Sequence, residues 1–414
     1  MGKMFMIAAV AAVLLLMDWY VSQAVKTLLF PLNAGWRKGL IALFWAISAI
    51  SILGILTVSF TGVFSRDINR LIVTAVVLVY FSKLFGVLTL MIDDIYHAGQ
   101  WVFQKIFSSG VEAPPAKPGI SRSEFISKAS LIAIAAPMAT FGFGILSGAH
   151  NYRVHRRTIY LPNLPAAFDG IQIGQLSDIH SGSFFSRSGV KKGISLFMEQ
   201  KPDIAFFTGD LVNDVAEEVK EYKDLYAKVK APLGVFSTLG NHDYGDYRSW
   251  PDLQAKRKNL ADLIRAQKEM GWDLLMNENR ILKVEGEEIA ILGVENWGAG
   301  RFSKYGDLAK AYAGTENKPV KLLLSHDPSH WDAQIRPQFG DIDVTFSGHT
   351  HGFQFGVEIG DFKWSPSQYI YKQWSDLHRE DKQYLYVNRG FGFLGYPGRI
   401  GILPEITIIA LKRG

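Results

Sequence analysis

The chain has no cysteine among its 414 residues. This absence excludes disulfide bonds, thiolate metal ligands and a cysteine nucleophile, and it leaves the redox compartment open. Charge is also sparse, since charged residues make up 20% of the chain and the formal net charge is only +5. The sequence lacks the dense Lys/Arg clusters with interleaved aromatic residues that favour nucleic-acid binding. It therefore predicts no nucleic-acid partner.

Long apolar runs fill residues 1–150, and four of them are long enough to cross a bilayer, which takes about 20 predominantly apolar residues. Pro137 interrupts the fourth run, and membrane helices tolerate proline when neighbouring groups satisfy the freed backbone. A cleaved signal peptide is the alternative for the first run, but that run is long for a signal and further runs follow it. The spans are predicted at about residues 4–25, 40–63, 71–91 and 129–146.

Two charged residues lie inside these spans, Asp18 near the end of the first and Lys83 within the third. Ionisable residues within a membrane are candidates for function. The alternative is an Asp at the interface and a Lys that snorkels or pairs with a neighbouring helix. No third polar residue indicates a relay or a transport path, so the sequence favours the structural interpretation.

An even number of spans places the amino terminus and residues 151–414 on the same side of the membrane. Basic residues in the short loops are almost equally divided between the two sides, so they do not identify that side. Residues 108–119 have the Pro/Gly composition of a linker, and Ser121–Lys128 after them resembles a degenerate twin-arginine export signal or is a plain flank. This flank and the lack of cysteine favour the outer face of the plasma (inner) membrane.

From Thr158 on, short apolar strands alternate with helical stretches such as Ala216–Val229 and Asp252–Met270, which is typical of a layered α/β domain. Five of the predicted strands, at 171–177, 203–208, 235–239, 320–324 and 343–347, lead directly into a short polar motif. Ligand-binding residues of α/β sheets lie at such strand ends. The motifs are Asp178-Ile-His180, Gly209-Asp210, Gly240-Asn241-His242-Asp243, Ser325-His326-Asp327 and Gly348-His349-Thr350-His351.

These motifs supply carboxylates, imidazoles and an amide without sulfur. Residues two apart on an extended chain point to the same side, so Asp178 with His180, and His349 with His351, can each converge on one metal. Oxygen and nitrogen donors suit Mn, Fe, Zn or Mg and do not select among them. One such motif alone is more often structural, but five in order after five strands predict a metal centre. We expect Asp214, Asp243 and Asp327 to orient the ligands through hydrogen bonds or to cap helices rather than to bind a metal.

With these five motifs, the chain from about Gln172 to its C-terminus resembles the calcineurin-like metallophosphoesterase superfamily. It is most similar to a membrane-attached bacterial branch that includes phosphodiesterases and enzymes that cleave the pyrophosphate of a UDP-linked diacylglucosamine, a step of lipid A biosynthesis. The closing segments 385–392 and 403–406 also resemble that branch. One departure is Phe353, where many relatives have a second glycine.

The resemblance implies an α/β fold, a four-layer αββα sandwich, preceded here by an all-α transmembrane region of about four helices. It implies one metal held by Asp178, His180, Asp210 and His351, and a second held by Asp210, Asn241, His326 and His349. Asp210 would bridge the two. His242 would lie near the scissile phosphate as a general acid or as a donor to the developing oxyanion.

Two divalent ions can activate a shared water, orient it and neutralise phosphate oxygens. The sequence therefore predicts a membrane-bound phosphodiesterase or pyrophosphatase, with no obligate protein partner evident, that uses metal-activated hydroxide. Attachment to a bilayer favours a lipid-linked or envelope phosphate ester, and the aromatic stretch 362–374 suits either an interface or ordinary packing. Arg389 and Arg399 could bind substrate phosphate or hold the closing turns. The alternative is a non-catalytic phosphate-binding or sensor module.

Overall fold

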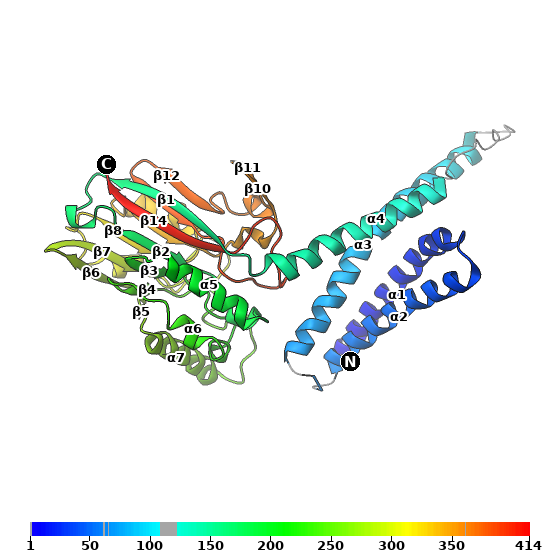
Figure 1. Cartoon of the computed structure of the whole chain (residues 1–414), viewed down its shortest axis with the longest axis horizontal. Coiled ribbons are helices and arrows are strands. Elements are labelled where there is room, and N and C mark those ends of the chain that lie inside the picture. The colour runs from blue at the N-terminus through cyan, green and yellow to red at the C-terminus, as the bar shows by residue number, and fades with distance from the viewer. Residues whose placement is uncertain (1, 61–62, 65, 108–121, 361) are drawn as a thin grey trace. The chain divides into compact units, whose positions relative to one another are not determined.

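The first part of the chain is helical, and the second part is built on two large β-sheets (Figure 1). The computed structural model describes all residues except 1, 61–62, 65, 108–121 and 361. The described residues divide into two units, Met1–Phe143 and Gly144–Gly414. The linker predicted at 108–119 lies outside the described residues.

The second unit begins a few residues before the domain boundary predicted at 150/151. The reason is that the turn Gly144–Gly148 belongs to the packing of this unit. The carbonyl of Gly144 accepts a hydrogen bond from Arg399 N (3.2 Å), and Gly148 lies against the backbone of Arg399 so closely that a Cβ there would overlap it.

Four long helices form the first unit, and each is long and apolar enough to span a membrane, as predicted. The third helix differs from the prediction because it continues past Met91 to Phe107. Its 42 residues extend about 63 Å at about 1.5 Å per residue, roughly twice the thickness of the hydrocarbon core. Hydropathy falls near Met91, but the next prolines are only at 114 and 115. The helices are α1 (Gly2–Leu29), α2 (Ala34–Phe60), α3 (Arg66–Phe107) and α4 (Arg122–Phe143).

A buried polar cluster joins three of these helices. Lys83 Nζ on α3 lies 2.5 Å from Asp18 Oδ1 on α1, and Tyr80 donates a hydrogen bond of 2.7 Å to the other carboxylate oxygen. Ser48 Oγ on α2 is 3.4 Å from the same ammonium. All four residues are buried, so the two intramembrane charges pair with each other across helices, as the structural interpretation predicts.

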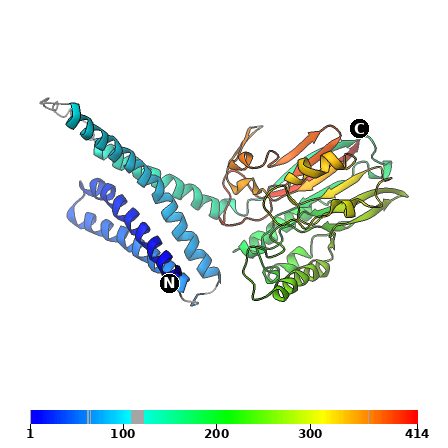
Figure 2. The ribbon, with the colours of Figure 1, turned by 180° about the vertical axis from the view of Figure 1, so that it is seen from behind.

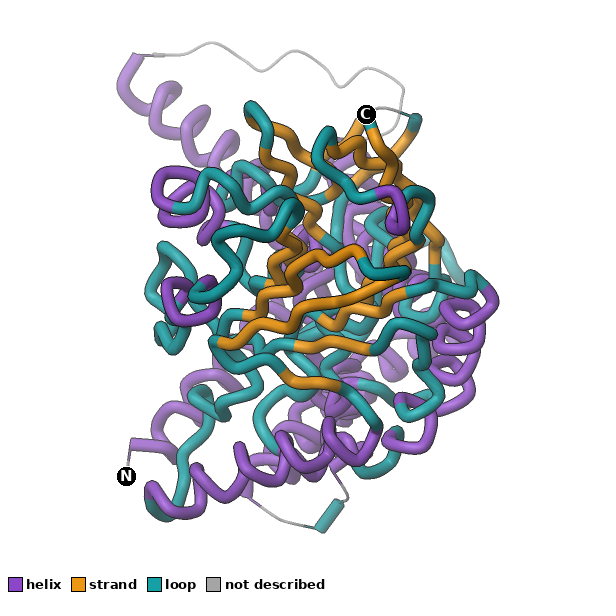
Figure 3. The backbone as a smooth tube through the Cα atoms, turned by 90° about the vertical axis from the view of Figure 1, so that its left-hand side faces the viewer, coloured by secondary structure: helices purple, strands orange, loops and turns teal. Residues whose placement is uncertain are grey.

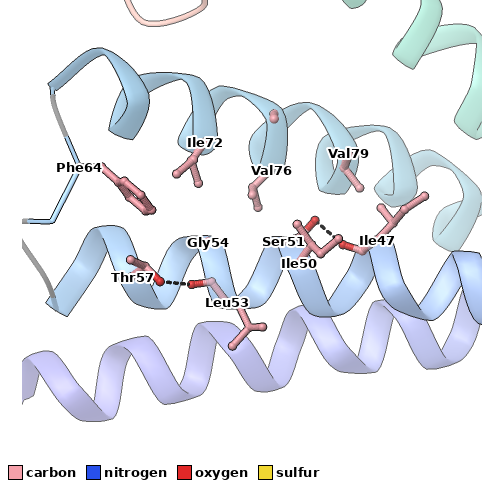
Figure 4. Close-up of a pocket in the computed structure, with 11 residues that line it drawn as sticks. Ile47, Ile50, Ser51, Leu53, Gly54, Thr57, Phe64, Ile72, Val76 and Val79 are labelled. Atoms are coloured by element: carbon pink, nitrogen blue, oxygen red, sulfur yellow. Dashed lines mark hydrogen bonds between the residues drawn. The ribbon is translucent and has the colours of Figure 1, made fainter.

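An apolar hollow of about 560 Å³ lies between α2 and α3 (Figure 4). Its hydroxyl groups bond to carbonyls one turn earlier in α2, Ser51 to Ile47 (2.8 Å) and Thr57 to Leu53 (2.8 Å). Because those polar groups are satisfied within their own helix, the hollow presents an apolar surface.

Two mixed six-stranded sheets form the second unit, in the orders β1-β14-β2-β3-β4-β5 and β12-β13-β9-β8-β7-β6. Strands β2 to β5 are parallel to one another, and so are β7, β8, β9 and β13. A separate two-stranded hairpin pairs β10 with β11. The strands are β1 (Arg153–Leu161), β2 (Gln172–Leu176), β3 (Ile204–Phe207), β4 (Val235–Ser237), β5 (Asp273–Leu274), β6 (Glu278–Val284), β7 (Glu287–Gly293), β8 (Lys321–Leu324), β9 (Val344–Ser347), β10 (Val357–Ile359), β11 (Phe362–Trp364), β12 (Asp376–Glu380), β13 (Gln383–Val387) and β14 (Glu405–Arg413).

Three hydrophobic cores separate four layers of secondary structure. One core lies between the first sheet and the helices α5, α6 and α7, a second lies between the sheets, and a third lies between the second sheet and helix α8 with the turn Trp331–Ile335. The strands run through the middle of this unit (Figure 3), and α7 is seen below them from behind (Figure 2). The predicted αββα sandwich is confirmed. The helices are α5 (Arg187–Glu199), α6 (Lys223–Tyr226), α7 (Leu253–Met270), α8 (Leu308–Tyr312) and α9 (Arg336–Gln338).

The five predicted motif-bearing strands are present as β2, β3, β4, β8 and β9. Helix α7 is also present, capped by Asp252, which accepts from Ala255 N (2.7 Å), and ended by Gly271 in the left-handed region. The prediction of one continuous helix at Ala216–Val229 is wrong, because only a 3₁₀ turn and the short helix α6 form there. Glu218, within that segment, is buried and accepts from Asn213 N (2.6 Å), which ties it to the loop after β3.

Candidate metal centre

The five polar motifs come from both sheets and meet in space. The first three follow the neighbouring strands β2, β3 and β4, and the last two follow β8 and β9 of the other sheet. His180 Nε2 and His351 Nε2 are 3.0 Å apart although 171 residues separate them in sequence. The strand ends of the two sheets therefore face one shared site.

One group of ligand atoms consists of Asp178, His180 and His351, whose side chains are buried and whose ligand atoms lie within 4.8 Å of one another. His351 Nε2 lies 3.3 Å from Asp178 Oδ1. Three buried groups of this kind, with their ligand atoms this close together, match the donor set of a divalent cation.

A second group consists of Asp210, His326 and His349, with the same mutual spacing. His326 Nε2 lies 3.2 Å from Asp210 Oδ2 and 3.2 Å from His349 Nδ1. Asp210 also reaches the first group, because the same Oδ2 is 3.5 Å from His180 Nε2. A single carboxylate therefore contacts both groups.

Asn241 contributes a buried amide near Asp210, because its chain neighbours Gly240 and His242 lie against that carboxylate. Its Nδ2 donates to Tyr247 Oη (2.9 Å), but its Oδ1 has no hydrogen-bond partner among the described residues. A buried carbonyl oxygen without a partner is costly. A cation in the second group would satisfy this oxygen, so the residues fit a metal there.

Hydrogen bonds on the far side of each ring fix which imidazole nitrogen faces the site. His326 Nδ1 donates to the carbonyl of Thr208 (2.7 Å), and His180 Nδ1 lies 3.1 Å from Asn213 Oδ1. His349 Nε2 is 2.7 Å from Tyr371 Oη. With Nδ1 held by these partners, His326 and His180 direct Nε2 into the site, and His349, held at Nε2, directs Nδ1 into it, which is the orientation that metal ligation requires.

Burial and charge set the protonation of these groups. Burial lowers the pKa of His180 to about 3 and lowers the pKa values of His349 and His351 below their usual range, so the three imidazoles are neutral at pH 7. Burial by itself would lower the pKa of His326, but the charge of Asp210 raises it to about 10. The carboxylate of Asp210 therefore needs a positive charge beside it.

The backbone is left-handed at many of the predicted ligands. Values of φ are 51° at Asp178, 50° at His180, 60° at Asp210, 70° at His349 and 52° at His351. Each such non-glycine residue costs of order 1–3 kcal/mol and persists only where the surrounding structure holds it, which is common at functional sites. The sharp turns aim these side chains away from the strand direction and into the site.

Two of these motifs begin with a glycine because their chain segments approach each other closely. At Gly209, φ is +97° and a Cβ would overlap the backbone of Gly240. At Gly240, a Cβ would overlap the carboxylate of Asp210. Both turns therefore require glycine.

Asp243 and Asp327 support the site as the sequence predicts, without joining either donor group. The buried carboxylate of Asp243 accepts backbone hydrogen bonds from Asp210 (2.9 Å), Leu211 (2.8 Å) and Gly240 (2.8 Å). Asp327 accepts from Ser329 N (2.8 Å) and lies 3.8 Å from His349 Nε2. The backbone carbonyl of Asp214 accepts from Asn259 (3.2 Å), and the role expected of its side chain stays a prediction.

His242 lies at the edge of the site and is half-buried. Its backbone N donates to Asp210 Oδ1 (2.9 Å), and its Nδ1 donates to the carbonyl of Asn213 (2.8 Å). Its ring centroid is 4.9 Å from that of His180. The anchored Nδ1 leaves Nε2 as the nitrogen that can exchange a proton with a substrate.

The two arginines predicted to meet substrate phosphate are fully buried. Arg389 Nη1 is 2.5 Å from Glu405 Oε2, and its Nη2 is 3.2 Å from Glu358 Oε1. Arg399 donates to the carbonyl of Gly392 (2.6 Å) and lies 3.3 Å from His351 Nδ1. These contacts correspond to the other alternative, in which both arginines hold the closing turns, and substrate binding by either stays a prediction.

Three residues that the sequence analysis missed orient the predicted ligands. Asn213 contacts both His180 and His242, Tyr371 contacts His349, and Tyr247 contacts Asn241. Asn213 lies three residues after Asp210, a spacing that could have drawn attention to it. Tyr371 lies within the aromatic stretch 362–374, but nothing local distinguishes it from the other aromatic residues there.

Comparison with known families agrees with this geometry. A family model described as "Calcineurin-like phosphoesterase" matches residues 171–353, which include all of the predicted metal ligands. A second, described as "Probable Calcineurin-like phosphoesterase, transmembrane domain", matches residues 3–149. The chain belongs to the calcineurin-like metallophosphoesterases. This phosphoesterase is thus a metal-dependent phosphoric ester hydrolase and a multi-pass membrane protein.

Curated relatives include membrane-associated members of the same family. The phosphoesterase is 29% identical to the uncharacterized metallophosphoesterase YkuE of Bacillus subtilis, over 71% of this chain and 98% of the relative. It is 29% identical to the UDP-2,3-diacylglucosamine pyrophosphatase LpxG of Chlamydia trachomatis, over 63% of this chain and 89% of the relative. It is 26% identical to the phosphodiesterase YaeI of Escherichia coli, over 70% of this chain and 99% of the relative.

Proposed function

We propose that this chain is a dinuclear phosphodiesterase or pyrophosphatase that acts on a lipid-linked or envelope phosphate ester at a membrane. The observation that supports it most strongly is the contact of Asp210 with both donor groups, His180 at 3.5 Å and His326 at 3.2 Å. A shared carboxylate between two His/Asp groups suits a pair of divalent cations rather than one.

In this proposal Asp178, His180, Asp210 and His351 hold one cation, and Asp210, Asn241, His326 and His349 hold the other. Mn, Fe, Zn and Mg all accept such oxygen and nitrogen donors. When bound, the two cations supply Lewis-acid charge that lowers the pKa of a water and neutralises phosphate oxygens. The neutral imidazoles of His180, His349 and His351 and the unpaired Asn241 oxygen favour occupancy by cations.

His242 is the proposed general acid or oxyanion donor. Its Nδ1 stays bonded to the carbonyl of Asn213 (2.8 Å) whether the ring is neutral or charged, so Nε2 can hold the proton that a leaving oxygen needs. Asp210 also fixes the position of this residue, because its Oδ1 accepts a hydrogen bond from the backbone N of His242 (2.9 Å). Asp210 thus positions the proposed acid as well as the cations.

The substrate class follows from the attachment and from the relatives. Four spans keep the sandwich at a bilayer, where a lipid-linked ester is concentrated. LpxG is named as a pyrophosphatase and YaeI as a phosphodiesterase, and these are the two reactions proposed for this chain. We place the chain in the plasma (inner) membrane with the sandwich on the outer face, following the export-like flank at Ser121–Lys128.

The test uses the full-length chain in detergent, stripped with chelator and resupplied with Mn²⁺. Hydrolysis of bis-p-nitrophenyl phosphate is compared with that of p-nitrophenyl phosphate, and then with that of UDP-2,3-diacylglucosamine in mixed micelles. The control is Asp210→Ala, which should lose both cations by elemental analysis. Metal-dependent turnover of the diester or pyrophosphate, absent from the control, is the expected result.

Other outcomes separate the alternatives. Faster hydrolysis of the monoester would refute a diester or pyrophosphate preference. Two bound cations without turnover of any of the three compounds would favour the non-catalytic phosphate-binding or sensor module. Two cations retained in Asp210→Ala would contradict the bridging role of this carboxylate.

A further inference from the structure

The β10–β11 hairpin has one apolar face. Its strands pair Val357 with Trp364 and Ile359 with Phe362. Because side chains alternate along a strand and directly paired residues share a face, these four lie on the same side. The hairpin is a sheet of its own and pairs with neither of the two six-stranded sheets (Figure 1).

The opposite face of the hairpin is polar and is fastened to the sandwich. Glu358 and Lys363 pair across the strands. Glu358 Oε1 lies 3.2 Å from Arg389 Nη2, and Lys363 bonds to Asp376. These ion pairs fix the orientation of the hairpin, so its apolar face is directed outward.

That outward face is unusually exposed for apolar side chains. Ile359 is 72% exposed and Phe362 63%, and just after the hairpin Tyr369 is 76% exposed and Ile370 67%. Among the described residues from Asn151 on, no other large apolar side chain is as exposed as these four. We call them the apolar rim. Clustered exposed apolar residues mark a surface that has a partner, whereas scattered ones do not.

The apolar rim is physically connected to the metal centre. Trp364 Nε1 lies 3.4 Å from Tyr369 Oη, and Ser365 donates to the carbonyl of Gly352 (2.7 Å), next to the ligand His351. Tyr371, immediately after Ile370, is 2.7 Å from His349 Nε2. The rim is therefore close along the chain to residues that contact the ligand His349 and the neighbour of the ligand His351.

The composition of the rim suits a bilayer better than a protein partner. Apolar side chains at the rim, Trp364 and Tyr369 with a polar end on each ring, and an exposed Lys372 nearby are the combination found at the headgroup boundary. The chain itself carries four helices long and apolar enough to span a bilayer, so a bilayer is the partner surface that the chain itself implies.

We propose that the apolar rim enters the headgroup region of the bilayer that holds the four spans. The rim would then hold the metal centre at the depth where the phosphates of membrane lipids lie. The membrane contact is inferred from the rim alone, whereas its benefit to catalysis rests on the proposed function. Insertion of such side chains reaches about 5–10 Å into the interface.

The absence of cysteine makes the contact directly measurable, since one introduced thiol is the only one in the chain. Ile359→Cys in the full-length protein is labelled with an environment-sensitive nitrobenzoxadiazole probe and reconstituted into vesicles of phosphatidylcholine and phosphatidylglycerol. The matched control is Leu253→Cys, which is similarly exposed (60%) but lies at the start of α7. Figure 1 shows α7 at the bottom of the sandwich and the hairpin at its top.

The expected result is that lipids spin-labelled near the headgroup remove about half or more of the emission at position 359 and little of it at position 253, as insertion into the interface requires. Equal, weak quenching at both positions would overturn the proposal. Emission at 359 that shifts to the blue only as the protein-to-lipid ratio rises would also overturn it, because it would indicate contact between copies of the chain.

A second measurement links the contact to turnover. Phe362→Ser should lower hydrolysis of vesicle-embedded UDP-2,3-diacylglucosamine roughly tenfold while leaving hydrolysis of bis-p-nitrophenyl phosphate unchanged, since it removes one large apolar group from the interface. Quenching at 359 without turnover of either compound would refute the proposed function and leave the bilayer contact standing. Turnover of the soluble ester without quenching would refute the bilayer contact and leave the proposed function standing.

Discussion

Replacing Glu405 with glutamine tests the buried ion pair that closes the sandwich at the start of β14. The fully buried carboxylate accepts hydrogen bonds from Arg389 Nη1 (2.5 Å), Tyr386 Oη (2.6 Å) and Thr407 Oγ1 (2.6 Å). Glutamine keeps the shape of the side chain but removes the charge. Arg389 would then stay buried without its main counter-ion.

The size of the effect follows from the pKa of this carboxyl group. Burial by itself would raise the pKa of Glu405, but Arg389 and the hydrogen bonds lower it from 4.5 to about 2. A difference of this size corresponds to about 3 kcal/mol of stabilisation of the folded state by the charged form. In a unit of this length the loss should lower Tm by roughly 6–12 °C.

The assay is thermal unfolding of the full-length protein in detergent, followed by intrinsic fluorescence in excess chelator so that metal loss contributes nothing. Because the folded-state pKa is depressed, the stabilisation is fully present above pH 4.5 and disappears as the pH falls to about 2. The parent and Glu405→Gln should therefore differ most at neutral pH and converge near pH 2. Glu217→Gln, which removes the charge from an exposed pair with Lys220, is the control and should leave Tm unchanged.

Two results would refute this reasoning. One is a Tm for Glu405→Gln equal to that of the control, and the other is a difference from the parent that stays constant between pH 7 and pH 2. The double variant Arg389→Met with Glu405→Gln separates charge burial from packing, because removing both partners should recover part of the lost stability.

Three further predictions concern the site, the membrane helices and the turn after the last motif. His242→Ala should keep both cations by elemental analysis but lose turnover by a factor of about 10² to 10⁴; full activity would exclude it from the mechanism. Lys83→Met leaves Asp18 buried without its 2.5 Å partner and should destabilise the helical unit by about 3 kcal/mol in a detergent-unfolding assay, whereas adding Asp18→Asn should restore it. Phe353, with φ at 58°, should tolerate glycine, and Phe353→Gly should raise Tm or leave it unchanged; a fall as large as that of Glu405→Gln would contradict backbone strain there.

Much of the architecture could be predicted from local sequence patterns. Apolar runs of bilayer length identify α1 to α4 because hydropathy acts along a single helix. The five strand-plus-motif units could be found because alternation and a following polar cluster are also local. The predicted end of the third span is too early for the same reason: hydropathy falls near Met91, but no residue breaks α3 before Phe107.

Only the tertiary structure decided which motifs become neighbours. The pattern places His180 and His351 at strand ends, but their 3.0 Å approach depends on the stacking of two different sheets. Asn213 and Tyr371 acquire their roles in the same way, since Asn213 lies outside the motifs and nothing local distinguishes Tyr371 within the stretch 362–374.

The arginines and the hairpin show this difference most clearly. Glycines around Arg389 and Arg399 are compatible with a flexible phosphate-binding turn, and nothing local reveals that Glu405 and Glu358 surround the first of them. Alternation along β10 and β11 separates two faces, but the sequence does not say which face meets the sandwich. Ion pairs between segments distant along the chain make that choice, because a local pattern determines the direction of a side chain and only the assembled fold determines what it meets.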